Sequence, residues 1–214
     1  MSKIVLVGAG GHALSVIDSI KSNGKYEIVG ITDLSNVAGE KVLGYEVIGN
    51  DAILKTVFDC GVKYAFVTVG SIGNTSLRKK LFYMLKDIRF ILPAMIDASS
   101  NIGSEVWLGE GAYIGKNTVV NAMSIIGDMA TINTGSIVEH GCCIDEFAHL
   151  GPGATICGDV KIGACTHIGA NATVIQGINI GDNSIIGAGS IVIHDVPSKV
   201  IAYGNPCKVV RNNE

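Results

Sequence analysis

The side chains best suited to proton transfer are histidines in the second half of the chain. His140 directly follows Glu139, and a carboxylate beside an imidazole can hold one tautomer and raise its basicity, as a general base requires. Gly158 follows His140 by 18 residues, and His167 follows His149 by the same interval of 18 residues. If this step corresponds to one spatial repeat, Gly158 leaves an open place beside His140 and exposes a backbone N–H. A base next to such a donor predicts acyl transfer, because the donor can stabilise an oxyanion.

A glycine-rich segment near the N-terminus has the composition of a phosphate-binding loop. Residues 8–13, GAGGHA, follow an apolar run and precede a helical pattern, which is the setting of a dinucleotide-binding loop. By itself the motif indicates NAD, with Asp33 on a ribose hydroxyl. However, Ala13 replaces the third glycine of the motif, and the domain has about four predicted strands, fewer than a full dinucleotide fold. A single nucleotide-linked sugar fits better, and an NAD-dependent enzyme stays an alternative.

A metal site is a further interpretation of the same histidine region. Side chains with suitable ligand atoms are His140, Cys142, Cys143 and His149. The repeat described next directs Cys142 into the core, so no metal is expected. The six cysteines form no C-x-x-C pair, which favours free thiols and a cytoplasmic protein.

The second half of the chain repeats every six residues. Isoleucine, leucine or valine occupies 17 successive positions six apart, from Ile96 to Val192. Glycine follows nine of them and Asn or Asp four more, which supplies turn conformations. Small or β-branched residues stand four positions after each aliphatic, and Ile178 is the only larger one. This period fits a coil with three short sides, one hexad per side, so three hexads return the chain to the same side.

The first half alternates between strand-like and helical patterns. Apolar runs lie at residues 4–7, 28–31, 64–69 and near 89–92, and helical patterns lie at 12–22, 51–59 and 75–86. This alternation predicts parallel βαβ units whose ligand site lies beyond the carboxyl ends of the strands. We expect a Rossmann-like nucleotide-sugar-binding domain at 1–93, a parallel β-helix acyltransferase domain at 94–196 and a C-terminal tail at 197–214.

Charge and hydropathy restrict the partners. The formal net charge is −3 without a basic cluster, which argues against a nucleic-acid-binding surface. Apolar residues nowhere form a run of about 18, so no insertion into a membrane is expected.

Residues 133–140 (NTGSIVEH) and 144–149 (IDEFAH) resemble the hexapeptide-repeat sugar acyltransferases. This group includes bacillosamine-pathway UDP-amino-sugar N-acetyltransferases, perosamine N-acetyltransferases and sialic acid O-acetyltransferases. The resemblance extends from the loop VGAGGH at 7–12 to GNPCK at 204–208. It implies a left-handed β-helix with three hexads per coil, acetyl-CoA as co-substrate, and a homotrimer with active sites between neighbouring β-helices.

The resemblance also implies roles for individual residues. His140 corresponds to the catalytic base and His149 to a contact with acetyl-CoA, and three further residues fall where backbone groups line the acetyl-CoA groove: Gly158, Ala170 and Ala188. Many relatives have an acidic residue directly after the base, whereas this chain has Gly141. Glu139 or another carboxylate would then take that role.

On the nucleotide-sugar side, the resemblance implies a second set of contacts. Residues near the diphosphate, sugar and base are Gly10, His12, Ala13, Leu14, Thr32, Asp33 and Gly70. An acidic pair of a relative is Thr32-Asp33 here, so one carboxylate is absent.

These observations lead to one main hypothesis. The chain is expected to transfer acetyl from acetyl-CoA to the amine of a nucleotide-linked 4-amino sugar, with UDP as the expected nucleotide, by direct attack and with His140 as base. The alternatives are an O-acetyltransferase of sialic acid or a related sugar, and a non-catalytic trimer that binds a nucleotide sugar.

Overall fold

The computed structural model describes residues 1–34 and 38–213. It divides into two compact units. The α/β unit consists of Met1–Ser71 and Ser76–Met95, and the β-helix unit consists of Ile72–Thr75 and Ile96–Glu214. Among the described helices, none has the length and apolar character needed to cross a bilayer.

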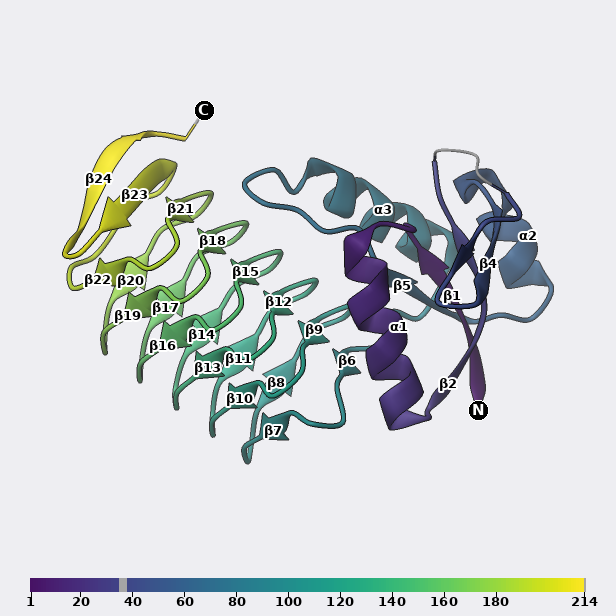
Figure 1. The fold of residues 1–214 in the computed structure, drawn as a ribbon, viewed down its shortest axis with the longest axis horizontal. Coiled ribbons are helices and arrows are strands. Elements are labelled where there is room, and N and C mark those ends of the chain that lie inside the picture. The colour runs from purple at the N-terminus through teal and green to yellow at the C-terminus, as the bar shows by residue number, and fades with distance from the viewer. Residues whose placement is uncertain (35–37, 214) are drawn as a thin grey trace. The chain divides into compact units, whose positions relative to one another are not determined.

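The α/β unit contains a five-stranded sheet (Figure 1). Its strands, in spatial order, are β3 (Lys41–Val42), β4 (Tyr45–Gly49), β2 (Tyr26–Thr32), β1 (Ser2–Val7) and β5 (Tyr64–Val67). The last four are parallel, and β3 pairs antiparallel with β4. The chain adds strands on one side of β1 and then crosses to β5 on the other. Ligands of such sheets bind at this reversal, beyond the carboxyl ends of the strands.

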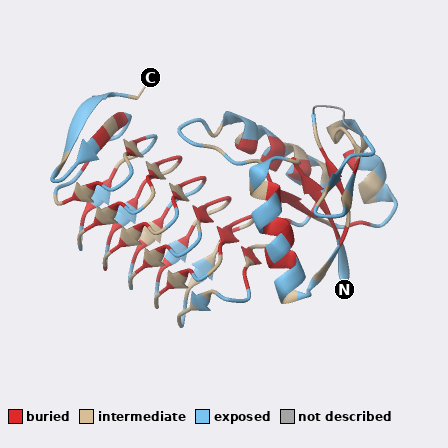
Figure 2. Ribbon diagram, in the orientation of Figure 1, coloured by how far each residue is buried: buried red, intermediate tan, exposed pale blue. Residues whose placement is uncertain are grey.

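The helices of this unit are amphipathic. They are α1 (Gly11–Asn23), the 3-10 turn η1 (Asp51–Ile53) with α2 (Leu54–Asp59), and α3 (Ser76–Ile88). In α1, buried residues recur at helical spacing, and Figure 2 shows one side of the helix buried. Gly24 ends α1 with φ of 64°, a left-handed conformation that glycine adopts without steric cost.

Most predicted elements of this half are confirmed, and one is wrong. Helices occupy the segments predicted at 12–22, 51–59 and 75–86. The strand expected near 89–92 is reduced to a single bridge between Tyr64 and Ile91. Arg89 has φ of 78°, outside the β region, so it cannot itself belong to a strand. The hairpin of β3 and β4 was not predicted, because its short strands carry charged residues.

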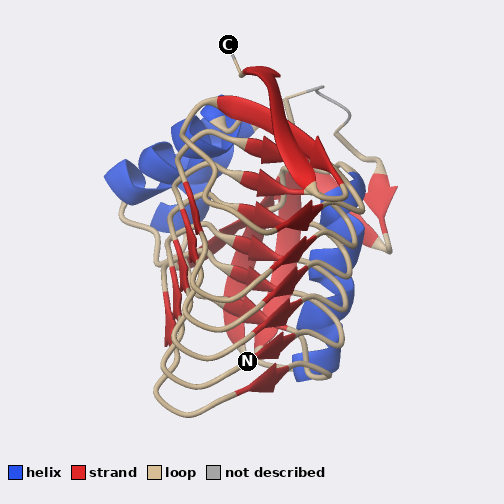
Figure 3. Cartoon of the chain, turned by 90° about the vertical axis from the view of Figure 1, so that its left-hand side faces the viewer, coloured by secondary structure: helices blue, strands red, loops and turns tan. Residues whose placement is uncertain are grey.

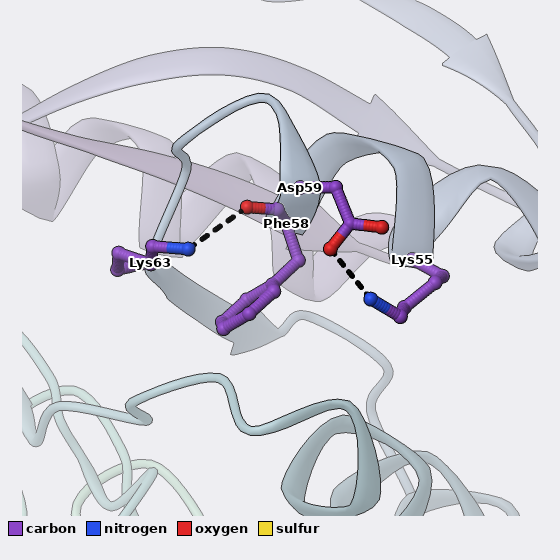
Figure 4. A network of polar contacts seen from close by, with 4 residues as sticks. All are labelled: Lys55, Phe58, Asp59 and Lys63. Atoms are coloured by element: carbon purple, nitrogen blue, oxygen red, sulfur yellow. Dashed lines mark hydrogen bonds and ion pairs between the residues drawn. The ribbon is translucent and has the colours of Figure 1, made fainter.

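Two lysines hold the end of α2 (Figure 4). Lys63 Nζ donates to the Phe58 carbonyl at 3.1 Å and lies 3.7 Å from the centroid of the Phe58 ring. Lys55 and Asp59 form an exposed i,i+4 ion pair with 2.5 Å between Nζ and Oδ1. The C-terminal end of a helix carries a partial negative charge, which a cation near the last carbonyls compensates. Lys63 therefore stabilises the transition from α2 into β5.

In the β-helix unit, each coil contributes one two-residue strand to each of three sheets. The first side holds β7 (Asn101–Ile102), β10 (Val119–Val120), β13 (Ile137–Val138), β16 (Thr155–Ile156), β19 (Thr173–Val174) and β22 (Ile191–Val192). The second side holds β8 (Trp107–Leu108), β11 (Ile125–Ile126), β14 (Cys143–Ile144), β17 (Lys161–Ile162) and β20 (Asn179–Ile180). The third side holds β6 (Met95–Ile96), β9 (Tyr113–Ile114), β12 (Thr131–Ile132), β15 (His149–Leu150), β18 (His167–Ile168) and β21 (Ile185–Ile186).

Neighbouring strands on a side are parallel and three hexads apart in the sequence, as in the pairing of Thr131 with His149 (Figure 3). The predicted interval of one coil is therefore confirmed, and the fold is an α/β domain followed by a left-handed parallel β-helix. Residues 200–212, within the expected C-terminal tail, form β23 (Val200–Gly204) and β24 (Cys207–Asn212). This antiparallel pair joins the third side through β21.

The repeated aliphatic residues fill the interior of the coils. From Ile114 to Val192 each of them is at most 2% exposed. Small hydroxyl residues complete this core and satisfy turn carbonyls one coil further on. Ser124 Oγ donates to the Glu139 carbonyl and Ser136 Oγ to the Gly151 carbonyl, both at 2.9 Å. A strict register results, and it places every outward side chain at a definite corner or side.

Candidate functional site

His140 lies at the first corner, which we define as the turns between the first and second sides. Its side chain is exposed, as its hexad position predicts, and its ring extends over Gly158 on the next coil. A Cβ at position 158 would lie 2.6 Å from His140 Cε1 and 2.8 Å from Nε2. The expectation of an open place beside the imidazole was therefore wrong, because the ring itself fills the space that the glycine leaves. The Gly158 N–H donates to no acceptor within 1–34 and 38–213.

At the same corner, a carboxylate from the next coil lies over the residue that follows His140. The Asp159 N–H donates to the His140 carbonyl at 3.0 Å. The Asp159 side chain turns back over Gly141, and its Oδ1 fills the space that a Cβ at 141 would need. Sequence reasoning missed Asp159. The interval of one coil, applied to Gly141, leads directly to it.

The carboxylate of Glu139 points toward the preceding coil. Asn121 Nδ2 donates to Glu139 Oε2 at 2.8 Å. Glu139 and His140 form no ion pair in the described part of the chain. The contact between these two side chains that their adjacency suggested is thus absent from a single chain.

A second group of predicted residues lies on the third side. His149 and His167 pair across β15 and β18, with ring centroids 4.9 Å apart and ring planes at 76°. Burial lowers the pKa of His167 to about 4, and the neighbouring His149 adds to the effect. The His167 imidazole is therefore neutral at neutral pH.

Ala170 and Ala188 stack on successive coils at the third corner, between the third and first sides. Their N–H groups donate to no acceptor in the part of the chain that the structure describes. A single chain thus separates the predicted residues into two groups. His140 and Gly158 lie at the first corner, whereas His149 and the two alanines lie on and beside the third side.

A metal held by His140, Cys142, Cys143 and His149 does not fit this arrangement. Cys142 is 1% exposed in the core, and burial raises the pKa of its thiol to about 11. His149 lies on a different side of the coil. The four side chains therefore do not converge.

In the α/β unit, predicted residues meet at the carboxyl edge of the sheet. Asp33, after β2, accepts a hydrogen bond from the Ala9 N–H at 2.7 Å and so links β2 to the glycine loop. Gly10 is the N-cap of α1, whose first turn carries no acidic residue, and a Cβ at Gly10 would meet nothing within 4 Å. A Cβ at Gly70 would lie 3.7 Å from His12 Cβ. An open helix N-terminus of this kind suits a phosphate group.

The remaining predicted residues of this edge differ in exposure. Leu14 is exposed, whereas Ala13 is buried and presents only its backbone. Thr32 is buried and donates through Oγ1 to Asp51 Oδ1 at 2.8 Å. Sequence reasoning missed Asp51, which brings a second carboxylate to the edge where Thr32 replaces an acidic residue.

Comparisons with known proteins agree with this architecture. Residues 3–85 match the family described as PglD N-terminal domain. A variant of perosamine N-acetyltransferase from Caulobacter crescentus, in complex with CoA and GDP-perosamine, is 36% identical with a TM-score of 0.93. The match covers 99% of this chain and 98% of that one. The acetyltransferase domain of PglB from Neisseria gonorrhoeae, in complex with acetyl coenzyme A, is 29% identical with a TM-score of 0.88, over 97% and 98% of the two chains.

An uncharacterized protein of Acanthamoeba polyphaga mimivirus is 33% identical over 124 residues. The match covers 58% of this chain, which spans only 23% of that curated relative. The Caulobacter enzyme is similar over almost the full length of both chains at 36% identity. Together with the α/β unit and the left-handed coils, this similarity shows that the chain belongs to the hexapeptide-repeat sugar acyltransferase family.

Proposed function

We propose that this protein transfers an acetyl group from acetyl-CoA to the amine of a nucleotide-linked 4-amino sugar, with His140 as general base. The observation that carries the proposal is the exposed imidazole of His140, seated over Gly158 at a corner of the β-helix. Relatives of similar length bind CoA and GDP-perosamine, or acetyl coenzyme A, which supports the two substrates.

The proposed reaction is direct attack in a ternary complex. The amine attacks the thioester carbonyl, a C–N bond forms, and the C–S bond breaks as the tetrahedral intermediate collapses. His140 takes the proton that the nitrogen must lose, and the departing CoA thiolate is protonated in turn. Backbone N–H donors stabilise the oxyanion, and the Gly158 N–H beside the base suits this role. No cysteine is needed as a nucleophile.

We propose that the active site forms between subunits of a homotrimer. Within one chain, His140 at the first corner is separated from His149 on the third side and from the N–H groups of Ala170 and Ala188 at the third corner. An acetyl-CoA groove between two β-helices would bring the first corner of one subunit to the third side of its neighbour. Each subunit then supplies the base for one site and contacts to acetyl-CoA for another.

We propose that the nucleotide sugar binds at the carboxyl edge of the α/β sheet. The diphosphate would lie at the N-terminus of α1 near Gly10 and His12, and the nucleoside would lie near Asp33 and Gly70. Although UDP was the expected nucleotide, a relative at 36% identity binds GDP-perosamine, which supports GDP as an equal candidate. Turnover of GDP- and UDP-linked 4-amino sugars, measured side by side, decides between the two bases.

The test compares His140→Ala with His194→Ala. His194 is an exposed histidine at the equivalent hexad position three coils further along, so it controls for the loss of a surface imidazole. CoA release should disappear in His140→Ala and persist in His194→Ala, while acetyl-CoA binding by calorimetry stays intact in both. Normal turnover of His140→Ala would refute the base assignment. Tight nucleotide binding without CoA release from any sugar would favour the non-catalytic trimer.

A further inference from the structure

Two carboxylates follow neighbouring strands at the carboxyl edge of the α/β sheet. Thr32, at the end of β2, pairs with Gly49, at the end of β4, and the Asp33 N–H donates to the Gly49 carbonyl at 3.0 Å. Beyond this last contact the two segments continue into Asp33 on one side and Asp51 on the other. Both carboxylates therefore belong to one stretch of the edge, beyond the ends of β2 and β4.

The two carboxylates differ in what already binds them. Asp33 Oδ2 accepts from the Ala9 N–H at 2.7 Å and thereby holds the glycine loop. Asp51 Oδ1 accepts from the hydroxyl of buried Thr32 at 2.8 Å, while its Oδ2 accepts no hydrogen bond from residues 1–34 or 38–213. Asp51 is also partly exposed. A carboxylate that is fixed through one oxygen thus keeps the other oxygen for a ligand.

The order of the strands gives the distance of Asp51 from the proposed diphosphate position. α1 begins after β1, β2 lies next to β1, and β4 lies next to β2. The end of β4 is therefore two strand spacings, about 10 Å, from the glycine loop. A diphosphate is attracted by the N-terminus of α1 and repelled by the two carboxylates. The nucleotide is thus oriented with its phosphates at β1, its ribose near β2 and an edge of its base toward β4.

A carboxylate distinguishes nucleobases by the donors on their edges. Guanine presents N1–H and its N2 amino group side by side, the same parallel pair of donors that arginine offers to a carboxylate. Uracil presents one N–H between two carbonyl oxygens, which a carboxylate repels. Leu34, directly after Asp33, is 65% exposed and offers an apolar surface to the flat face of either base. The edge of the base, and not its face, therefore decides which nucleotide fits.

We propose that Asp51 is a specificity-determining residue that selects guanine, so that the acceptor is a GDP-linked amino sugar. The inference rests on the proposed function, from which it takes the position of the diphosphate at α1. Thr32 acts through Asp51, because its hydroxyl holds Oδ1 and so fixes the direction of Oδ2. The carboxylate that position 32 lacks is thus supplied from η1, with a role in base recognition.

The experiment measures the binding of GDP, IDP and UDP by calorimetry. IDP lacks only the N2 amino group of guanine, so it reports on that one contact. Asp51→Asn keeps an acceptor for the Thr32 hydroxyl and places an amino group where Oδ2 was. Leu34→Ala removes the apolar surface without changing the polar edge. The matched control is Asp59→Asn, which removes an exposed carboxylate of α2 that pairs with Lys55.

Wild type should bind GDP about tenfold more tightly than IDP, and roughly ten- to a hundredfold more tightly than UDP. Asp51→Asn should lose about tenfold or more in affinity for GDP and should bind GDP and IDP equally. Its affinity for UDP should stay or rise, because the new amino group can donate to a uracil carbonyl. Leu34→Ala should weaken GDP and UDP by the same factor, and Asp59→Asn should change neither.

The outcomes separate the inference from the proposed function. Equal affinity of wild type for GDP and UDP would overturn the inference. A parallel loss of all three nucleotides in Asp51→Asn would also overturn it, because the carboxylate would then only maintain the shape of the edge. Failure of wild type to bind any of the three nucleotides would instead refute the proposed function itself.

Discussion

Gly158→Ala is the substitution that tests the geometry of the base most directly. The new Cβ would lie 2.6 Å from His140 Cε1, whereas non-bonded carbons are stable at about 3.5–4.0 Å. The ring must therefore move by about 1 Å or rotate away. The backbone at 158 has no positive φ, so alanine itself causes no strain there. His140 is exposed, and its ring can shift without disturbing the core.

The expected result is a large catalytic loss in a protein of normal stability. A displacement of about 1 Å from the productive geometry costs roughly a hundredfold in rate, equivalent to about 2.7 kcal/mol of transition-state stabilisation. The free energy of unfolding should stay within about 0.5 kcal/mol of wild type. CoA release is followed by chromatography, so that the cysteines of the protein do not interfere.

Two comparisons complete the test of Gly158→Ala. In a His140→Ala background the new methyl group meets no ring, so any small loss of stability should disappear there. Activity of Gly158→Ala within twofold of wild type would refute the reasoning, because it would mean that the position of the ring over Gly158 is irrelevant to turnover.

Three further predictions concern individual contacts and thiols. Asp33→Ala should weaken nucleotide-sugar binding and lower the free energy of unfolding by about 1–3 kcal/mol, because the Ala9 N–H loses its acceptor; calorimetry and urea unfolding measure the two effects. The unfolded chain protonates His167 near pH 6.5 and the folded chain near pH 4, so stability should fall by about 3 kcal/mol as pH drops between these values. Urea unfolding of His167→Gln should lack this slope, and an equal slope would contradict the assignment. Iodoacetamide at pH 8 should label exposed Cys60 and spare Cys142, whose pKa is about 11, as peptide mass spectrometry would show.

The β-helix could be predicted in detail because one aliphatic residue per hexad leaves a single way to fill a three-sided interior. The pairing of His149 with His167 and the position of Gly158 beside His140 both follow from that period. A sequence period predicts which way each Cβ points, but it does not determine the conformation of the side chain beyond the Cβ. That limit explains why the ring filled the place expected to be open, and why the carboxylate of Asp159 was missed.

The α/β unit was less predictable, because its contacts depend on packing that no period determines. Asp51 meets Thr32 only because β4 pairs with β2, and the short strand β4 gave no clear apolar signal. The mistaken strand near residue 91 has the same origin. An apolar run there suggested a strand, whereas Arg89 has a positive φ and the pairing that follows it is limited to one bridge at Ile91.

The register of three hexads per coil also restricts how such a chain can change in length over generations. After duplication or loss of one whole coil, each remaining residue still stacks on a residue at the equivalent position of the neighbouring coils. Only the number of coils changes. A single-residue insertion must bulge outward at a corner, since otherwise every later aliphatic residue would turn away from the interior. Between His140 and Gly158 even a bulged insertion at the first corner would alter the gap that the imidazole occupies. Gene length along this half of the protein is therefore expected to vary in steps of whole coils. The coil that contains His140 should be the least tolerant of insertions or deletions of any other length.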